Sequence, residues 1–471
     1  MDSQMTPGRA YLSRVPRLSG LLALVAAATL TACASLSPEQ AAAPVQQKSR
    51  DWLGADLLLQ RADEQRAAAR ARTDALLNHR GLQAGLYGLG MAESERVQTL
   101  LWPNPVLDIG RLVRGDEREI ERGLQFNLLS LLGRGARQQA GARALEREQA
   151  RVAQQLLDVA GQARRRWIQA VASQEQLRHA RTVLDSASAG AELALRMRQA
   201  GNVSALRLAR ERTVLAESQL AMEQAQLQAA GDREALIRAI GLWGDDLALL
   251  KLPERLPDVP VDFRTADDVE RQAVAQRLDI LAAKRESEQL AARLGLTRQT
   301  GRVNVLELGL QRNSSNEEPT QRGIELSVEL PLFDWGQARV AGAREAYGQS
   351  LERTAQVAIE ARSDVRVART RAEAAWRIAR RHHDEVLPLA RQVSDETLLR
   401  YNGMLVGVMD LLADARVQAR AVSATLAAQR DFWLAESTLS QSLLGPVRDD
   451  AATASSSSTV AAPEGAGGAA H

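Results

Sequence analysis

The chain has 471 residues and a formal net charge of +2, from 60 basic and 58 acidic side chains. Hydrophobic residues make up 45% of it and aromatic residues only 3%, a balance that suits long helices packed through small side chains better than globular cores. Because charges of both signs are interspersed, no segment has the character of a nucleic-acid-binding surface, and we expect no nucleic-acid partner.

Residues 1–32 are interpreted as a lipoprotein signal peptide. Arginines precede an apolar run at 21–30, which is too short to span a bilayer as a helix. The run ends in Leu30-Thr31-Ala32-Cys33, which resembles the bacterial lipobox, where the chain is cleaved before a cysteine that then carries lipid. Cys33 is the only cysteine in the sequence and cannot form an internal disulfide. We therefore expect a covalent lipid on Cys33, and Ala34 in place of Asp favours sorting to the outer membrane.

The segment at 33–103 is predicted to be helical, with a break across the glycines of residues 81–90. The helical pattern ends at Trp102-Pro103-Asn104-Pro105, where two prolines prevent its continuation. A different kind of structure is therefore expected to begin there.

Two β-hairpins are predicted. In the first, alternating apolar residues stand on either side of a charged stretch at 114–122, which is expected to interrupt the strands. In the second, strands at 303–310 and 324–330 flank a polar loop at 312–321. Each strand has about the ten residues that a membrane β-barrel needs.

Two long helices are predicted after each hairpin. Their ranges are 137–199, 204–240, 339–399 and 408–444. Glycines Gly201 and Gly403 mark the turns within the two helix pairs, and leucines and alanines at heptad spacing predict a coiled-coil seam. At about 1.5 Å per residue, a helix of some sixty residues is about 90 Å long, which no compact core requires.

The hairpin and its helices occur twice, at 104–241 and 301–445. Corresponding strand residues at 123–128 and 323–328 differ by 200 positions, and we interpret the two copies as a tandem duplication.

Two further segments complete the chain. Residues 242–300 are expected to be a linker with further helices. The segment at 446–471, rich in alanine and serine, is expected to be a disordered tail.

The strands admit two interpretations. A strand with one apolar and one polar face borders either a protein core or the boundary between lipid and a watery lumen. The length of the strands and the charged loops favour the membrane interpretation. Trp102, Phe333 and Trp335 form either an interfacial girdle or ordinary packing between strands and helices. Because an open sheet edge cannot be left in hydrocarbon, the membrane interpretation requires several chains.

Four motifs resemble the outer-membrane efflux factor family, the TolC-like channel components of tripartite export systems. They are Asn104-Pro105, Pro331-Leu332-Phe333-Asp334-Trp335-Gly336, Arg400-Tyr401-Asn402-Gly403 and Leu443-Leu444-Gly445. The resemblance implies a mainly α chain with a membrane β-barrel part. It implies a long antiparallel coiled-coil tunnel and four strands per chain, which form a trimeric twelve-stranded barrel. It also implies periplasmic positions for 33–103 and 242–300.

The resemblance further implies a conduit rather than an enzyme. Its partners would be two more copies of the chain, outer-membrane lipid, a periplasmic adaptor and an inner-membrane pump that supplies the energy. In the family the helical turns meet the adaptor and narrow the tunnel. The candidate adaptor contacts are therefore Gly201, Asn202, Gly403, Met404 and Leu405, although the apolar pair Met404 and Leu405 could equally pack between helices.

Asp410 and Asp414 are the candidate tunnel constriction. They stand four residues apart on one helix face, and in a trimer each would recur three times around an axis. Such carboxylate rings would attract cations. The alternative is a pair of acids that are solvated or paired with arginine, with Arg416 as the candidate partner.

No catalytic constellation or metal site is predicted, and we expect no cofactor besides the lipid. Two functions remain. The first is a passive export channel for drugs, metal ions or other solutes, whose identity the sequence does not specify. The alternative is a lipid-anchored periplasmic coiled-coil scaffold without a pore.

Overall fold

The computed structural model describes residues 38–53, 79–244, 247, 250–263, 268–300 and 305–447. The predicted signal peptide, Cys33 and nearly all of the predicted tail lie outside these residues. The chain divides into two compact units, each built from segments distant in the sequence. Unit 1 comprises residues 1–41, 90–145 and 291–344, and unit 2 comprises residues 42–89, 146–290 and 345–471.

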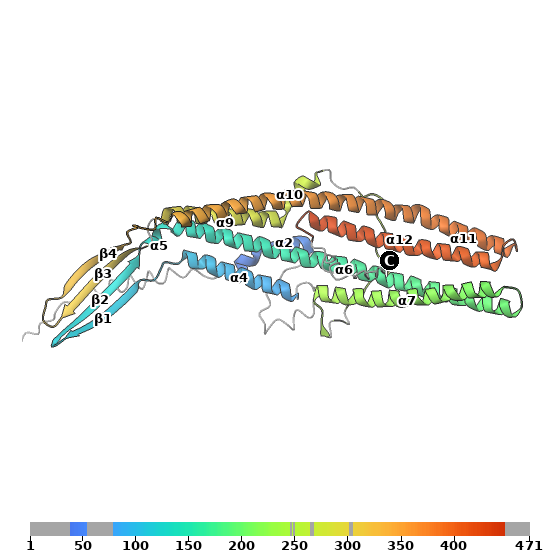
Figure 1. Cartoon of the computed structure of the whole chain (residues 1–471), viewed down its shortest axis with the longest axis horizontal. Helices are drawn as coiled ribbons and strands as arrows, with labels where there is room; N and C mark the ends of the chain where they lie inside the picture. Colours follow the sequence, from blue (N-terminus) through green and yellow to red (C-terminus); the bar gives the residue numbers. More distant parts are fainter. Residues whose placement is uncertain are drawn as a thin grey trace, which may run out of the picture. The chain divides into compact units, whose positions relative to one another are not determined.

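The described chain is mainly helical and contains one four-stranded sheet (Figure 1). The strands are β1 (Val106–Arg114), β2 (Glu117–Asn127), β3 (Leu306–Ser315) and β4 (Gln321–Val328). The helices are α2 (Pro38–Leu53), α4 (Arg80–Leu100), α5 (Leu129–Leu132), α6 (Arg134–Gln199), α7 (Ala205–Ile240), α8 (Val269–Gln276), α9 (Leu278–Thr300), α10 (Gln337–Arg381), the π-helical η3 (His382–Val386), α11 (Leu387–Asn402) and α12 (Val408–Ser442). The predicted succession of a hairpin and long helices, repeated once, is confirmed.

The strands pair antiparallel in the order β1-β2-β3-β4, without an inserted residue in any register. The prediction that the charged stretch at 114–122 interrupts the first hairpin is wrong, since β1 and β2 are joined by Gly115 and Asp116 alone. The second loop is likewise only 316–320. The prediction followed apolar and polar alternation, whereas the acidic residues of β2 alternate with Arg118, Ile120 and Arg122, and the distal end of β3 is polar on both faces.

Registers place every strand residue on one of two faces, because residues paired across neighbouring strands project to the same side. The apolar face carries Leu107, Ile109, Val113, Ile120, Leu124, Phe126, Leu306, Leu308, Leu310, Ile324, Leu326 and Val328. The acidic face carries Asp108, Glu117, Glu119, Glu121, Glu307 and Glu325, with Gly110, Gly123, Gly309 and Gly323 among them. The apolar face lacks cover within the chain, as the 78% exposed fraction of Ile324 illustrates.

Helix α4 runs unbroken through residues 81–90, so the predicted break there is wrong. One hydrophobic core of unit 2 joins α2, α4 and α6. Its buried residues are Ala42, Val45, Leu82, Leu86, Leu89, Val152 and Leu156. A Cβ atom on Gly85 would lie only 2.4 Å from the Gln155 side chain of α6. Gly85 therefore leaves room for the Gln155 side chain against α4, which offsets the low helix propensity of glycine there.

The predicted helix at 339–399 is interrupted by η3. The Leu387 amide donates to the His382 carbonyl, five residues back, which is the π-helical pattern. Pro388 follows as the second residue of α11. Proline has no amide proton and its ring crowds the carbonyl four residues earlier, so that widening of the preceding turn relieves the clash.

Small side chains dominate the contact of α10 with α12 in unit 2. Ala368, Ala372 and Leu439 form one buried cluster, and Ala379 and Ala428 pack with Phe432 in another. Alanine allows helix backbones to approach closely, as the composition predicted.

The linker at 250–263 is attached to these helices by two indole groups. Trp376 of α10 donates to the Pro260 carbonyl and Trp433 of α12 to the Pro257 carbonyl, each at 2.9 Å. Proline has a carbonyl acceptor but no amide donor. An indole N–H, which can only donate, therefore pairs well with a proline carbonyl. Two of the chain's few aromatic residues thus fix the linker.

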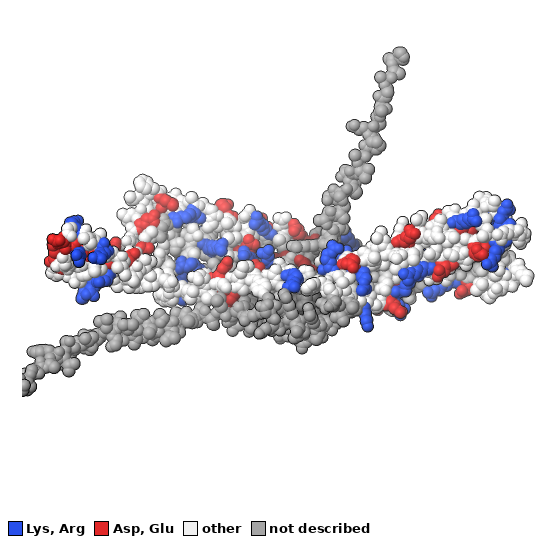
Figure 2. Space-filling view, turned by 90° about the horizontal axis from the view of Figure 1, so that it is seen from below, with Lys and Arg blue, Asp and Glu red and all other residues white. Residues whose placement is uncertain are grey.

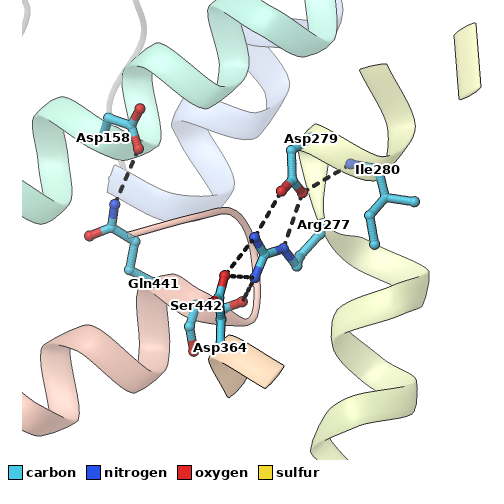
Figure 3. A network of polar contacts seen from close by, with 7 residues as sticks. All are labelled: Asp158, Arg277, Asp279, Ile280, Asp364, Gln441 and Ser442. Atoms are coloured by element: carbon cyan, nitrogen blue, oxygen red, sulfur yellow. Dashed lines mark hydrogen bonds and ion pairs between the residues drawn. The ribbon is translucent and has the colours of Figure 1, made fainter. Parts of the chain in front are cut away.

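Arg277, between α8 and α9, is almost completely buried in unit 2, and Figure 3 shows the polar contacts of its guanidinium. Its guanidinium donates to Asp279 at 2.8 Å, to Asp364 of α10 at 3.5 Å and to the Ser442 carbonyl at the end of α12 at 3.3 Å. The next amide, that of Leu278, donates to the Leu444 carbonyl at 2.9 Å. One arginine therefore ties the linker helices to both long helices of the second repeat.

We expect Arg277→Ala to lower the free energy of unfolding of the detergent-solubilised protein by about 3 kcal/mol, because Asp279 and the Ser442 carbonyl lose their buried donor. Chemical denaturation followed by far-UV circular dichroism measures this. The matched control is Arg366→Ala, which removes an exposed ion pair with Glu270 in the same unit and should cost less than about 1 kcal/mol. Equal effects of the two variants would contradict the assigned role of Arg277.

Candidate functional site

The first helical turn, between α6 and α7, lies where the sequence predicted it. Gly201 has a left-handed backbone with φ of 79°. The Asn202 amide donates to the Met197 carbonyl at 2.8 Å and the Gly201 amide to the Arg198 carbonyl at 3.1 Å, which closes the α6 end in a Schellman motif. Ser204 then begins α7 by accepting a hydrogen bond from the Arg207 amide.

The second turn, between α11 and α12, repeats this motif with a different residue at its critical position. The Leu405 amide donates to the Arg400 carbonyl and the Met404 amide to the Tyr401 carbonyl, both at 2.9 Å. Met404, with φ of 58°, therefore stands where Gly201 stands in the first turn, and Gly403 has an ordinary φ of −80°. The predicted match of Gly201 with Gly403 is thus displaced by one residue.

Met404 and Leu405 present apolar side chains to solvent, with exposed fractions of 94% and 77%. The alternative that they pack between helices does not hold within this chain. A left-handed methionine costs more than a left-handed glycine, and such strain is typical of functional positions.

Asp410 and Asp414 both have partners near this turn. The Asp410 carboxylate accepts a hydrogen bond from the Gly407 amide at 3.1 Å and so caps the start of α12. Asp414, half-buried one turn later, accepts from the Thr397 hydroxyl of α11 at 2.5 Å. The two candidate constriction residues therefore hold the second turn together, and Arg416 is not the partner of either.

Arg416 instead forms an ion pair with Glu211 of α7, which the sequence analysis missed. The Glu211 side chain is only 5% exposed, so the pair links the helices of the two repeats with little solvent screening. The position could have been recognised, since Glu211 lies between Leu208 and Leu215 at coiled-coil spacing, where an acid needs a partner.

A cavity of about 340 Å³ adjoins this ion pair. It is lined by residues of α6, α7 and α12, among them His179, Val183, Val214, Leu412 and Val422. A ring nitrogen of His179 lies 2.8 Å from the Ala419 carbonyl, which joins α6 to α12. Helices α6, α7 and α12 thus meet around a small, mainly apolar cavity beside an ion pair whose acid is buried.

Among the described residues, no three histidine, cysteine, aspartate or glutamate side chains are grouped to hold a metal ion. The helices described include none that is both long and apolar enough to cross a bilayer. Figure 2 shows basic and acidic side chains interspersed along the helices on the face it presents. Charges of one sign do not gather into a separate surface on that face, which agrees with the expectation of mixed, solvated helix faces.

Comparisons with solved structures identify the fold. The outer membrane protein VceC from Vibrio cholerae has 15% identity and a TM-score of 0.65, over 79% of this chain and 95% of that one. The CmeC outer membrane channel of Campylobacter jejuni has 15% identity and a TM-score of 0.63, over 82% and 88%. The open state of the MtrE outer membrane channel of Neisseria gonorrhoeae has 18% identity and a TM-score of 0.63, over 79% and 87%.

No protein-family model matches the sequence, and no curated protein matches it either. The chain nevertheless has the fold of the TolC-like outer-membrane efflux channels, as the sequence motifs predicted. The fold class with a long helical part and a four-stranded sheet is confirmed.

Met404→Gly is expected to raise the free energy of unfolding by about 1 kcal/mol, because glycine adopts the left-handed conformation without the Cβ clash. Thermal unfolding of the purified protein measures it. Gly403→Ala, at the neighbouring position with an ordinary φ, should be neutral or slightly stabilising. Destabilisation by Met404→Gly would show that the methionine side chain packs in the assembled protein.

Proposed function

We propose that this chain is the outer-membrane channel of a tripartite efflux system, a homotrimer that passively conducts solutes to the exterior. The observation that carries the proposal is the sheet of unit 1, whose apolar face is exposed and whose other face is acidic and rich in glycine. A sheet of this kind fits a boundary between lipid and an aqueous lumen.

The edges of the sheet support the trimer. β1 and β4 each have a neighbour on one side only, so one row of backbone amides and carbonyls on each is unpaired within the sheet. In hydrocarbon these groups must be paired, and four strands are too few to close a barrel. Three copies would supply twelve strands, with β4 of one chain beside β1 of the next.

The acidic face supports a water-filled lumen. Its carboxylates lean over glycines of the adjacent strands, as the distance of 3.0 Å between an added Gly110 Cβ and the Glu121 carboxylate illustrates. Glycines leave room between the strands and the lumen axis, and carboxylates remain ionised in water. Such a surface would favour cations over anions during conduction.

The helical turns are the proposed contact with a periplasmic adaptor, which would join the channel to an inner-membrane pump. Gly201, Asn202, Gly403, Met404 and Leu405 lie at these turns, and Met404 and Leu405 provide exposed apolar surface there. Asp410 and Asp414 would form the constriction. We propose a lipid anchor at Cys33, an outer-membrane location, and no enzymatic activity or cofactor; drugs and metal ions are both candidate cargo.

The alternative is a lipid-anchored periplasmic scaffold without a pore. It requires the apolar face to be covered by protein, whereas this face is largely exposed within the chain. The comparison structures named above are outer-membrane proteins, which also supports the channel.

Purified full-length protein should form trimers in detergent and conduct ions in planar bilayers. Light scattering in the same detergent gives the oligomeric mass, and single-channel recording gives the conductance. A soluble, non-conducting species after removal of the lipid would favour the scaffold.

Asp410→Ala combined with Asp414→Ala should raise single-channel conductance, because the variant removes the carboxylate rings and the hydrogen bonds that close the second turn. The matched control is Asp395→Ala, an exposed acid on α11 for which the structure assigns no partner. Its conductance should equal that of the unsubstituted protein. Unchanged conductance in the double variant would exclude these aspartates as the constriction.

A further inference from the structure

The charged residues of the strands are segregated by sign between the two faces. All six acidic residues of β1 to β4 lie on the acidic face. Five of the six arginines lie on the apolar face, namely Arg111, Arg118, Arg122, Arg312 and Arg322. Random placement would not separate the signs in this way, so the apolar face carries a basic zone of its own.

Three of these arginines form one row across the sheet. Arg122 of β2 pairs with Arg312 of β3, which pairs with Arg322 of β4. The same row reaches Ile109 on β1, and Arg111 and Arg118 lie further toward the loops. We call Arg122, Arg312 and Arg322 the arginine row.

The arginine row lies directly beside the apolar band. The next row toward the helices is Leu107, Leu124, Leu310 and Ile324, followed by Phe126, Leu308 and Leu326, and then by Leu306 and Val328. At about 3.4 Å per residue, Arg322 stands about 20 Å along β4 from Val328. Because barrel strands tilt by about 35–45°, this length corresponds to roughly 15 Å along the membrane normal, which is part of the apolar band of about 25 Å.

Exposed aromatic residues border the other end of the band. Phe333, Trp335 and Trp102 are 98%, 55% and 62% exposed, and the Arg134 guanidinium lies 5.0 Å from the Trp102 ring centre. Their exposure argues against ordinary packing within the chain and fits an interfacial girdle. The apolar band is thus bordered by aromatic residues at one end and by arginines at the other.

The arginine row has no carboxylate partner among the described residues. Its side chains are exposed and form no ion pair there, and the loop acids Asp116, Glu317 and Glu318 are not paired with it either. Like charges directly opposite each other on a sheet are unfavourable. An anion bound across the row would remove this repulsion, and the planar guanidinium matches phosphate oxygens in pairs.

We propose that the arginine row binds the phosphate groups of anionic lipids in the leaflet that surrounds the distal end of the strands. This inference rests on the proposed membrane location of the sheet. Charge complementarity and continuity with the apolar band select a lipid phosphate, whose acyl chains would lie against Leu310 and Ile324. Figure 2 shows basic and acidic side chains together at the free end of the strand unit, at the left of the view.

The test is native mass spectrometry of full-length protein taken from liposomes of phosphatidylcholine mixed with phosphatidic acid. The unsubstituted protein should retain phosphatidic acid in preference. The triple variant Arg122→Gln, Arg312→Gln, Arg322→Gln should lower this preference by up to about a hundredfold, since each of the three arginines near an anionic surface contributes about fivefold. Added salt should lower the retention in the unsubstituted protein.

The matched control removes the same charge from exposed arginines of α10 and α11: Arg353→Gln, Arg362→Gln, Arg391→Gln. It should keep the preference. If the first triple variant does not fold, Arg312→Gln is compared with Arg114→Gln, which lies on the opposite face of the sheet. Equal lipid retention by a variant and its control would overturn the proposal. A changed oligomeric mass with unchanged lipid retention would also overturn it, because the arginine row would then bind another chain.

Conductance in pure phosphatidylcholine bilayers separates this inference from the proposed function. Conduction by an unsubstituted protein that shows no lipid preference would overturn the phosphate site and leave the channel standing. Absence of conduction and of bilayer insertion would overturn both.

Discussion

The unpaired backbone groups along the outer edges of β1 and β4 are the constraint on which the proposed assembly depends. A row of amides and carbonyls without partners is tolerable in water and costs several kcal/mol per group in hydrocarbon. In the proposed membrane location, a sheet whose apolar face the chain leaves exposed would therefore need neighbours at both edges at once. The short hairpin turns also favour edge pairing, because strands that continue through the charged residues offer a longer edge.

The helical unit is stabilised differently, by close packing of small residues and a few buried polar contacts. Alanine-rich contacts of α10 with α12 allow long helices to associate without large cores. Arg277 and the two linker-bound indoles then fix the irregular segments to those helices. Such contacts are directional, so they set the position of the linker along the helices, which alanine contacts alone leave free to slide.

Helices, turns and the two hairpins could be predicted from the sequence because they depend on local patterns, whereas the pairing of β2 with β3 joins residues distant in the sequence. The predictions that were wrong failed for other physical reasons. Gly85 sits within a helix because of the space beside Gln155, which only the tertiary structure reveals. The distal strands were mistaken for loops because β2 alternates there mainly between acidic and basic residues, and the distal end of β3 is polar on both faces. For the candidate site, the turns were located correctly, but the Glu211–Arg416 pair and the bonds of Asp410 and Asp414 depend on which helices lie side by side.

The two repeats differ at the helical turns. Both chain reversals use the same hydrogen-bond pattern, yet one places glycine and the other methionine in the left-handed position. Backbone geometry therefore does not require the methionine. Its strain is compensated only if the side chain, fully presented to solvent in the single chain, gains contacts elsewhere. A partner that binds exposed apolar side chains would distinguish the second turn from the first. A trimer, with two turns per chain, would then offer three apolar turns rather than six equivalent ones.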